Sequence, residues 1–100
     1  MVIYMYRNYL DLNKKSIRRN VIFKLKILGY DIEENVGIRT IQSIIEKIQL
    51  ENGLISDGLI GRNTMPLLGY NQEEIKKMLK IPDSSNKKSV FDIFIHLLLF

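Results

Sequence analysis

Three polar side chains stand near predicted helix starts, and their types suit the binding of an anion. Arg39 lies two residues after Gly37, and Arg62 and Asn63 follow Gly61 directly. The first N–H groups of a helix have no partner within the helix and favour a carboxylate or a phosphate. A guanidinium adds charge-assisted hydrogen bonds to such a group. We therefore expect Arg39, Arg62 and Asn63 to bind an anionic ligand; for each arginine the alternative is a solvated surface position.

Two tyrosines could add a flat contact surface. Tyr30 and Tyr70 each follow a Leu-Gly pair that closes a predicted helix. A tyrosine ring has an apolar face and a polar tip, which suits a sugar ring or a peptide. The alternative is that each ring packs over the end of its helix.

Residues for catalysis are sparse. His96 is the single histidine, it lies in an apolar segment, and the chain has no cysteine to pair with it. Asp31, Glu33 and Glu34 lie together in a short connection, but glycoside hydrolysis needs two carboxylates across a sugar cleft. A solvated turn is the expected structure there, and we expect neither enzymatic activity nor a cofactor.

The stretch GLISDGLIGRNT, residues 53–64, contains an Asp-Gly pair like the middle of a calcium loop. With Asp57 at the fifth position, the first, third and twelfth positions would be Gly53, Ile55 and Thr64. A calcium loop needs oxygen-bearing side chains at those positions. The sequence therefore predicts no metal site.

The same stretch predicts a tight turn. We expect Asp57 to accept backbone N–H groups within the loop, and Gly58 and Gly61 to adopt conformations closed to other residues. The loop's own role would be to turn the chain, and any binding would come from the residues it presents.

A G-x-x-T pattern occurs twice, at Gly37 to Thr40 and at Gly61 to Thr64. A glycine can adopt the positive φ of a sharp turn, and a threonine hydroxyl near a helix start can accept an unpaired N–H. The repeat predicts two similar loop-to-helix junctions.

The elements that position these residues are predicted to be helices. The central helix is predicted from residue 38 onward, because five isoleucines recur with a period near 3.6. Gly53 is expected to end it. Its opposite face is expected to carry the polar residues, which are Gln42, Ser43, Glu46, Lys47 and Gln49. The other predicted helices span residues 16–29, 62–68, 72–80 and 90–100.

Capping residues mark several of these boundaries. Ser16 is a candidate N-cap of the first helix and Gly29 follows its end. Asn71 and Glu74 have the spacing of a capping box at the start of the helix over 72–80. The first dozen residues fit either a strand or a helix.

Charge is concentrated near the N-terminus. Residues 1–30 contain seven basic residues and one acidic residue, a net charge of +6 in a chain whose total is +4. Such a patch could meet nucleic acid or an anionic wall polymer, although a solvated helix face is the simpler explanation.

The segment over residues 90–100 is apolar at nine of eleven positions. It is too short to span a bilayer as a helix, so we expect it to cover the core, to form a homo-oligomer or to dock on a partner. No secretory signal is visible, which leaves the localisation open.

The order of motifs over residues 16–70 resembles the helical peptidoglycan-binding domain attached to many bacterial and phage cell-wall hydrolases. The positions that carry the resemblance are Leu28, Gly29, Tyr30, Gly37, Thr40, Ile48, Gln49, Gly53, Leu54, Asp57, Gly58, Gly61 and Thr64. Two departures are Ile48, where the family usually has an aromatic residue, and a shorter segment between Tyr30 and Gly37.

The resemblance implies an all-α fold, a small three-helix bundle with additional C-terminal helices. Its organisation would be an extension over 1–15, the peptidoglycan-binding-like domain over 16–81, a linker over 82–89 and an apolar helix over 90–100. The implied function is a non-catalytic module that holds a hydrolase or an assembly against peptidoglycan or its stem peptides. The alternative is a small basic helical adaptor for protein contacts, with nucleic acid the less favoured partner.

Overall fold

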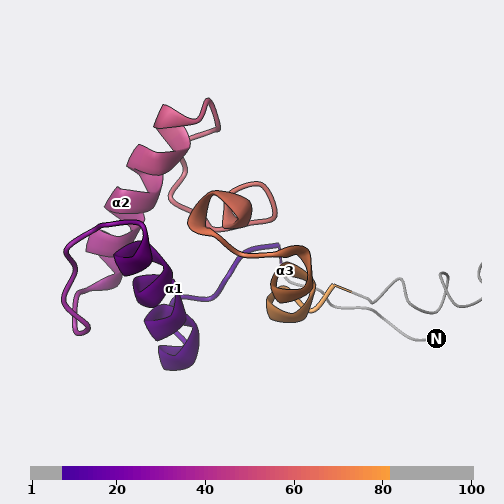
Figure 1. Cartoon of the computed structure of the whole chain (residues 1–100), viewed down its shortest axis with the longest axis horizontal. Coiled ribbons are helices and arrows are strands. Elements are labelled where there is room, and N and C mark those ends of the chain that lie inside the picture. Colours follow the sequence, from indigo (N-terminus) through magenta and orange to yellow (C-terminus); the bar gives the residue numbers. More distant parts are fainter. Residues whose placement is uncertain (1–7, 82–100) are drawn as a thin grey trace, which may run out of the picture.

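The computed structural model describes residues 8–81, and this part of the chain contains only helices and loops (Figure 1). The elements are α1 (Lys15–Ile27), α2 (Ile38–Glu51), the 3₁₀ helix η1 (Met65–Leu68) and α3 (Gln72–Met78). The predicted all-α class is thus confirmed. The expected linker over 82–89 and the expected helix over 90–100, which contains His96, lie outside the described residues.

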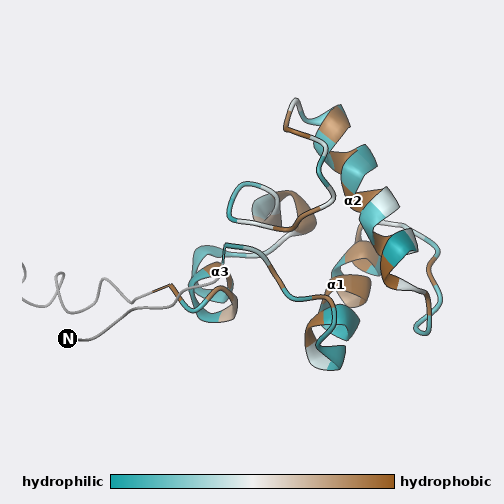
Figure 2. Ribbon diagram, turned by 180° about the vertical axis from the view of Figure 1, so that it is seen from behind, coloured by the Kyte–Doolittle hydropathy of each residue, from teal (hydrophilic) through white to brown (hydrophobic). Residues whose placement is uncertain are grey.

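The isoleucine pattern of α2 buries one face of that helix. Ile41, Ile45 and Ile48 are buried, and so is Gln49. The prediction that Gln49 lies on the polar face was wrong, because it stands four residues after Ile45 and a helix brings such residues to one side. Figure 2 shows apolar and polar segments alternating along α1 and α2, as expected for helices with one buried face.

The helix starts differ from those expected at α1 and α2. The N-cap of α1 is Lys14 rather than Ser16, and no side chain caps it. Gly37 is the N-cap of α2 with φ −73°, so it needs no positive φ, and no side-chain hydrogen bond caps that helix either. The expected roles of Gly37 and Thr40 at this junction were therefore wrong. At α3 the capping box of Asn71 and Glu74 is confirmed.

The third predicted helix is shorter than the sequence indicated. Only Met65 to Leu68 is helical, and it is a 3₁₀ turn; residues 62–64 form turns. Pro66 lies in its first positions, where the missing N–H is tolerated. Arg62 and Asn63 therefore lie on a turn before η1 and not on a helix.

The two Leu-Gly-Tyr sequences end their helices in the same way. The N–H of Tyr30 donates to the carbonyl of Leu25 at 3.0 Å, and the N–H of Tyr70 donates to that of Met65 at 3.2 Å. The glycine before each tyrosine has φ near +100° or +90°. Both ends are Schellman motifs, in which glycine is favoured because it lacks a Cβ.

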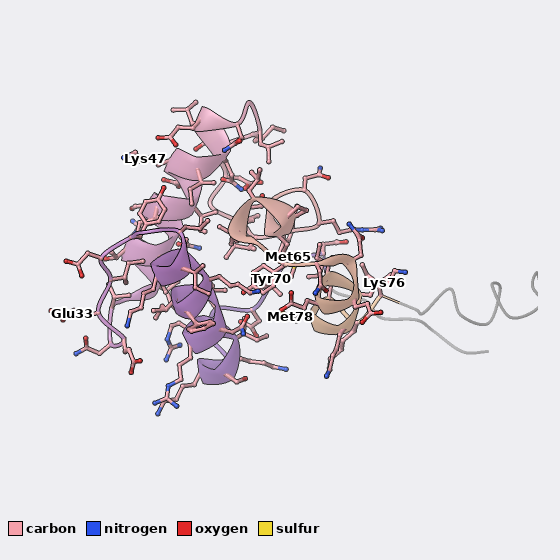
Figure 3. All side chains as sticks on the ribbon, viewed as in Figure 1. Glu33, Lys47, Met65, Tyr70, Lys76 and Met78 are labelled. Carbon is pink, nitrogen blue, oxygen red and sulfur yellow. The ribbon has the colours of Figure 1, made fainter. Side chains whose placement is uncertain are left out.

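A single apolar core joins all four helices, and α1 packs against η1. Figure 3 shows Met65 and Tyr70 directed inward, whereas Glu33 and Lys47 extend outward. Leu10 and Leu12 belong to the same core, so the core includes part of the segment expected to be an extension. Within residues 8–81 no helix is long and apolar enough to cross a membrane.

Candidate functional site

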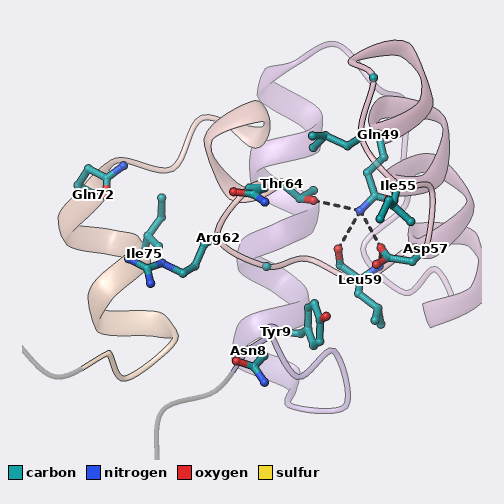
Figure 4. A pocket seen from close by; sticks show the side chains of 14 residues that line it. Asn8, Tyr9, Gln49, Ile55, Asp57, Leu59, Arg62, Thr64, Gln72 and Ile75 are labelled. Atoms are coloured by element: carbon teal, nitrogen blue, oxygen red, sulfur yellow. Dashed lines mark hydrogen bonds between the residues drawn. The ribbon is translucent and has the colours of Figure 1, made fainter.

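The side chain of Gln49 holds the loop over residues 53–64 from the C-terminal end of α2 (Figure 4). Its Nε2 lies 3.0 Å from Asp57 Oδ1, 2.9 Å from the Leu59 carbonyl and 3.0 Å from Thr64 Oγ1. Its Oε1 accepts the N–H of Gly58 at 2.9 Å. The two amide hydrogens are thus shared among three oxygens, and one buried side chain fixes four points of the loop.

Asp57 and Gly58 have the structural roles expected from the sequence. Asp57 Oδ1 accepts the N–H of Leu59 at 2.9 Å, within the loop. Gly58 has φ +72°, and a Cβ there would lie 3.3 Å from Glu46 Cγ. Thr64 behaves differently from the expectation: it caps no N–H and its hydroxyl instead accepts from Gln49.

Gly61 is needed for close packing and not for a positive φ, which corrects the expected conformation. A Cβ at this position would lie 3.0 Å from the carbonyl oxygen of Asn8 and 3.1 Å from Tyr9 Cδ1. Next to these residues, the N–H of Leu10, which follows Tyr9, donates to the carbonyl of Ile60, which precedes Gly61, at 2.9 Å. The small size of Gly61 therefore lets the segment with Asn8 and Tyr9 lie against the loop.

Beside this approach lies a surface hollow of about 840 Å³, which we call the Arg62 hollow. Residues from four parts of the chain line it: the N-terminal segment, the end of α2, the loop after α2, and α3. The lining includes Tyr9, Ile55, Leu59, Arg62, Asn63 and Gln72. Tyr9 is 46% exposed and Ile55 is 83% exposed, so the hollow offers apolar surface to a ligand.

Arg62 and Asn63 supply the polar groups of the hollow. Both are exposed, and in Figure 4 the Arg62 side chain extends toward α3. Within residues 8–81 the Arg62 guanidinium has no hydrogen-bond or ion-pair partner. A guanidinium that lines the same hollow as an aromatic ring can bind a carboxylate while other groups of the same ligand contact the ring.

The structure separates the other candidate ligand residues from this hollow. Arg39 is exposed on the first turn of α2, in a different hollow with Thr40 and Glu46. Tyr30 is partly buried and packs against the core. The two arginines therefore do not act on one site.

Tyr70 is 4% exposed and its ring belongs to the core. Its hydroxyl donates to Asn20 Oδ1 at 2.7 Å, and Lys24 Nζ lies 4.8 Å from the ring centroid. Burial, with a smaller effect of the negative charge of Glu74, raises the pKa of the Tyr70 hydroxyl. The structure thus places Tyr70 where the packing alternative expected it, with no free ring face for a ligand.

Sequence reasoning missed two residues of this region. Tyr9 lies in a segment with no clear periodicity, so its aromatic type was the one signal that could have marked it. Gln49 had a usable signal, because it shares a helix face with Ile41 and Ile45, both fully buried.

The described residues hold no group of three or more His, Asp or Glu side chains that could bind a metal. Asp31, Glu33 and Glu34 are exposed, and Glu34 Oε1 lies 3.9 Å from Lys26 Nζ. In the described part of the chain, Asp57 is the one carboxylate that lines the hollow, and it accepts a hydrogen bond from Gln49.

Comparison of the chain with protein-family models, with curated proteins and with solved structures finds no match.

Proposed function

We propose that this chain is a non-catalytic module that binds peptidoglycan through the Arg62 hollow and so holds a hydrolase or an assembly at the cell wall. The observation that carries the proposal is that Arg62 is exposed, has no partner for its guanidinium within residues 8–81, and lines the same hollow as the half-exposed ring of Tyr9. The motif order over residues 16–70 supports the same function by resemblance.

The ligand chemistry follows from these groups. Peptidoglycan combines sugar rings with short peptides that end in carboxylates. In our proposal Arg62 pairs with a peptide carboxylate, and the Asn63 amide is free to bond a neighbouring peptide group. Tyr9, Ile55 and Leu59 contact the apolar faces of sugars or of alanine side chains.

The proposed role is binding and not hydrolysis. General acid–base cleavage of a glycosidic bond uses a pair of carboxyl groups. Among residues 8–81, Asp57 is the one carboxylate that lines this hollow, and its Oδ1 accepts from both Gln49 and the Leu59 N–H. Asp57 therefore has a structural role in holding the loop, and the described part of the hollow offers no second carboxylate.

Sedimentation with purified sacculi tests this function. We expect the full chain to be retained on sacculi stripped of anionic polymers, and to stay bound at high salt because the contacts are not only ionic. A chain that remains in the supernatant under both salt conditions contradicts the proposal.

A helical adaptor for another protein is the second candidate. The exposed apolar side chains of α1 and its C-cap favour it, since Phe23, Ile27 and Leu28 are 59%, 66% and 46% exposed. Failure to bind stripped sacculi would favour this adaptor over the wall-binding module.

A further inference from the structure

A second, basic groove runs along α1, on the side of the connection between α1 and α2. One part is a hollow of about 620 Å³, lined by Lys15, Arg18 and Arg19 together with residues 34–38. The other part is a hollow of about 390 Å³, lined by residues of α1 from Arg19 to Lys26 and again by Glu34. Because Arg19 and Glu34 line both, the two hollows adjoin. We call them the α1 groove.

The α1 groove carries four cations and a single carboxylate among its lining residues. Lys15 and Arg19 are exposed and have no partner within residues 8–81. Arg18 donates one N–H to the Leu12 carbonyl at 2.9 Å, which leaves its other donors free. Lys26 lies near Glu34, the one acid of the groove. The groove is therefore electropositive and suits a polyanion.

The cations are spaced along the helix axis. Lys15 and Arg19 are four residues apart, a rise of about 6 Å, and Arg19 and Lys26 are seven apart, a rise of about 10 Å. A linear chain of phosphodiesters can place successive phosphates beside such a row, whereas a single small anion could use only one or two of the charges.

The number of aromatic residues in the groove helps to distinguish a single-stranded nucleic acid from a phosphodiester chain without bases. Single-stranded nucleic acids are usually held by several aromatic rings that stack successive bases. Among residues 8–81, Phe23, which is 59% exposed, is the one aromatic residue lining the α1 groove. A phosphodiester chain without bases fits the row of charges and needs no series of aromatic rings for base stacking.

We propose that the α1 groove binds the glycerol phosphate chain of an anionic wall polymer. This inference rests on the proposed wall-binding function, and it assigns a second wall component to the same module. The groove and the Arg62 hollow share no lining residue, so the two sites can be tested separately.

Titration of the full chain with fluorescently labelled poly(glycerol phosphate) tests the groove. The double variant Lys15→Gln/Arg19→Gln is expected to weaken binding about tenfold and to reduce the slope of log K against log salt by about 1.4, as for two lost phosphate contacts. Glu34→Gln is expected to strengthen binding, because it removes the one repulsive charge. Circular dichroism verifies that each variant is folded.

The matched control is Lys76→Gln/Lys77→Gln, which removes the same charge from α3, outside the groove. It is expected to weaken binding much less. An equal loss in this control would overturn the proposal, because net charge alone would then explain the affinity. Tighter binding of oligothymidylate with the same number of phosphates, lost in Phe23→Ala, would overturn it in favour of single-stranded nucleic acid.

The two proposals fail in different ways. Retention on stripped sacculi without measurable binding of poly(glycerol phosphate) overturns the groove and leaves the Arg62 hollow supported. Binding of the polymer through Lys15 and Arg19 without retention on stripped sacculi supports the groove and contradicts the hollow.

Discussion

The side-chain amide of Gln49 donates to the hydroxyl of Thr64 over 3.0 Å, across fifteen residues of sequence. This buried contact joins the end of α2 to the N-cap of η1. Arg62 and Asn63 lie between Leu59 and Thr64. Gln49 bonds to both of those residues, so it helps to position the segment between them. The candidate site is therefore built on a polar contact inside the fold.

Replacing Gln49 by alanine should destabilise the protein by about 3 kcal/mol, since buried partners such as the Thr64 hydroxyl and the Gly58 N–H would lose their hydrogen bonds. Urea denaturation measures the change. Gln72→Ala, at an exposed glutamine of α3, is the matched control and should cost less than about 0.5 kcal/mol. Equal effects of the two variants would show that the Gln49 contacts contribute nothing specific.

Alanine variants of Gly58 and Gly53 distinguish the effect of backbone strain from the effect of side-chain crowding. Both have φ +72°, but only at Gly58 would a Cβ meet another residue, Glu46 Cγ at 3.3 Å. Gly53→Ala should lower the free energy of unfolding by about 1 kcal/mol, because alanine is strained in a left-handed backbone conformation. Gly58→Ala should cost at least about 0.5 kcal/mol more, because Glu46 must also move. The ranking is tested by thermal or urea unfolding, and the reverse order would contradict it.

Gly61→Ala should displace the segment with Asn8 and Tyr9, since the added Cβ would approach the Asn8 carbonyl oxygen to 3.0 Å. The expected result is faster hydrogen exchange at the Leu10 N–H, which bonds to Ile60, and a loss of about 1–2 kcal/mol of stability. Gly37→Ala is the control, because a Cβ there meets nothing within 4 Å. Unchanged exchange at Leu10 would show that the loop tolerates the larger residue.

The contacts of the Glu74 carboxylate with the Asn71 N–H and with Lys24 should make stability depend on pH. The Asn71 N–H, and then Lys24, lower the pKa of the Glu74 carboxyl. Because unfolded glutamate binds its proton at a higher pH, these contacts contribute stability above the ordinary glutamate pKa. That contribution is lost as the pH falls through the lowered pKa of the folded state.

Urea midpoints measured from pH 6 downward test this dependence. The urea midpoint of Glu74→Gln should fall less steeply with acidification than the midpoint of the unmodified chain. Glu73→Gln, at the exposed neighbouring position, should keep the original slope. Identical curves for all three proteins would mean that Glu74 is not linked to folding.

The sequence predicted those parts of the fold that depend on local patterns. The isoleucine period located α2, and the spacing of Asn71 and Glu74 located the start of α3, because both signals lie within a single helix. The extent of η1 was overestimated because packing around Met65 and Leu68, and not local propensity, determines it. The G-x-x-T repeat did not predict two equivalent junctions, because Gly37 is the N-cap of α2 whereas Gly61 allows close packing of Asn8 and Tyr9.

The candidate site was only partly predictable. Arg62 and Asn63 were identified from their types beside a glycine, and the structure places both on one hollow. Tyr9 joins them only through tertiary packing against Gly61, which no local pattern encodes. Arg39 was grouped with Arg62 by the repeated motif, but the fold separates the two.

Binding to stripped sacculi at high salt, compared between Arg62→Ala and Arg39→Ala, tests the central claim most directly. Both variants remove one exposed arginine, so net charge is matched. We expect Arg62→Ala to weaken retention about tenfold or more, as for a lost charge-assisted hydrogen bond, and Arg39→Ala to bind like the unmodified chain. Equal retention of the two variants would contradict the assignment of the Arg62 hollow as the peptidoglycan site.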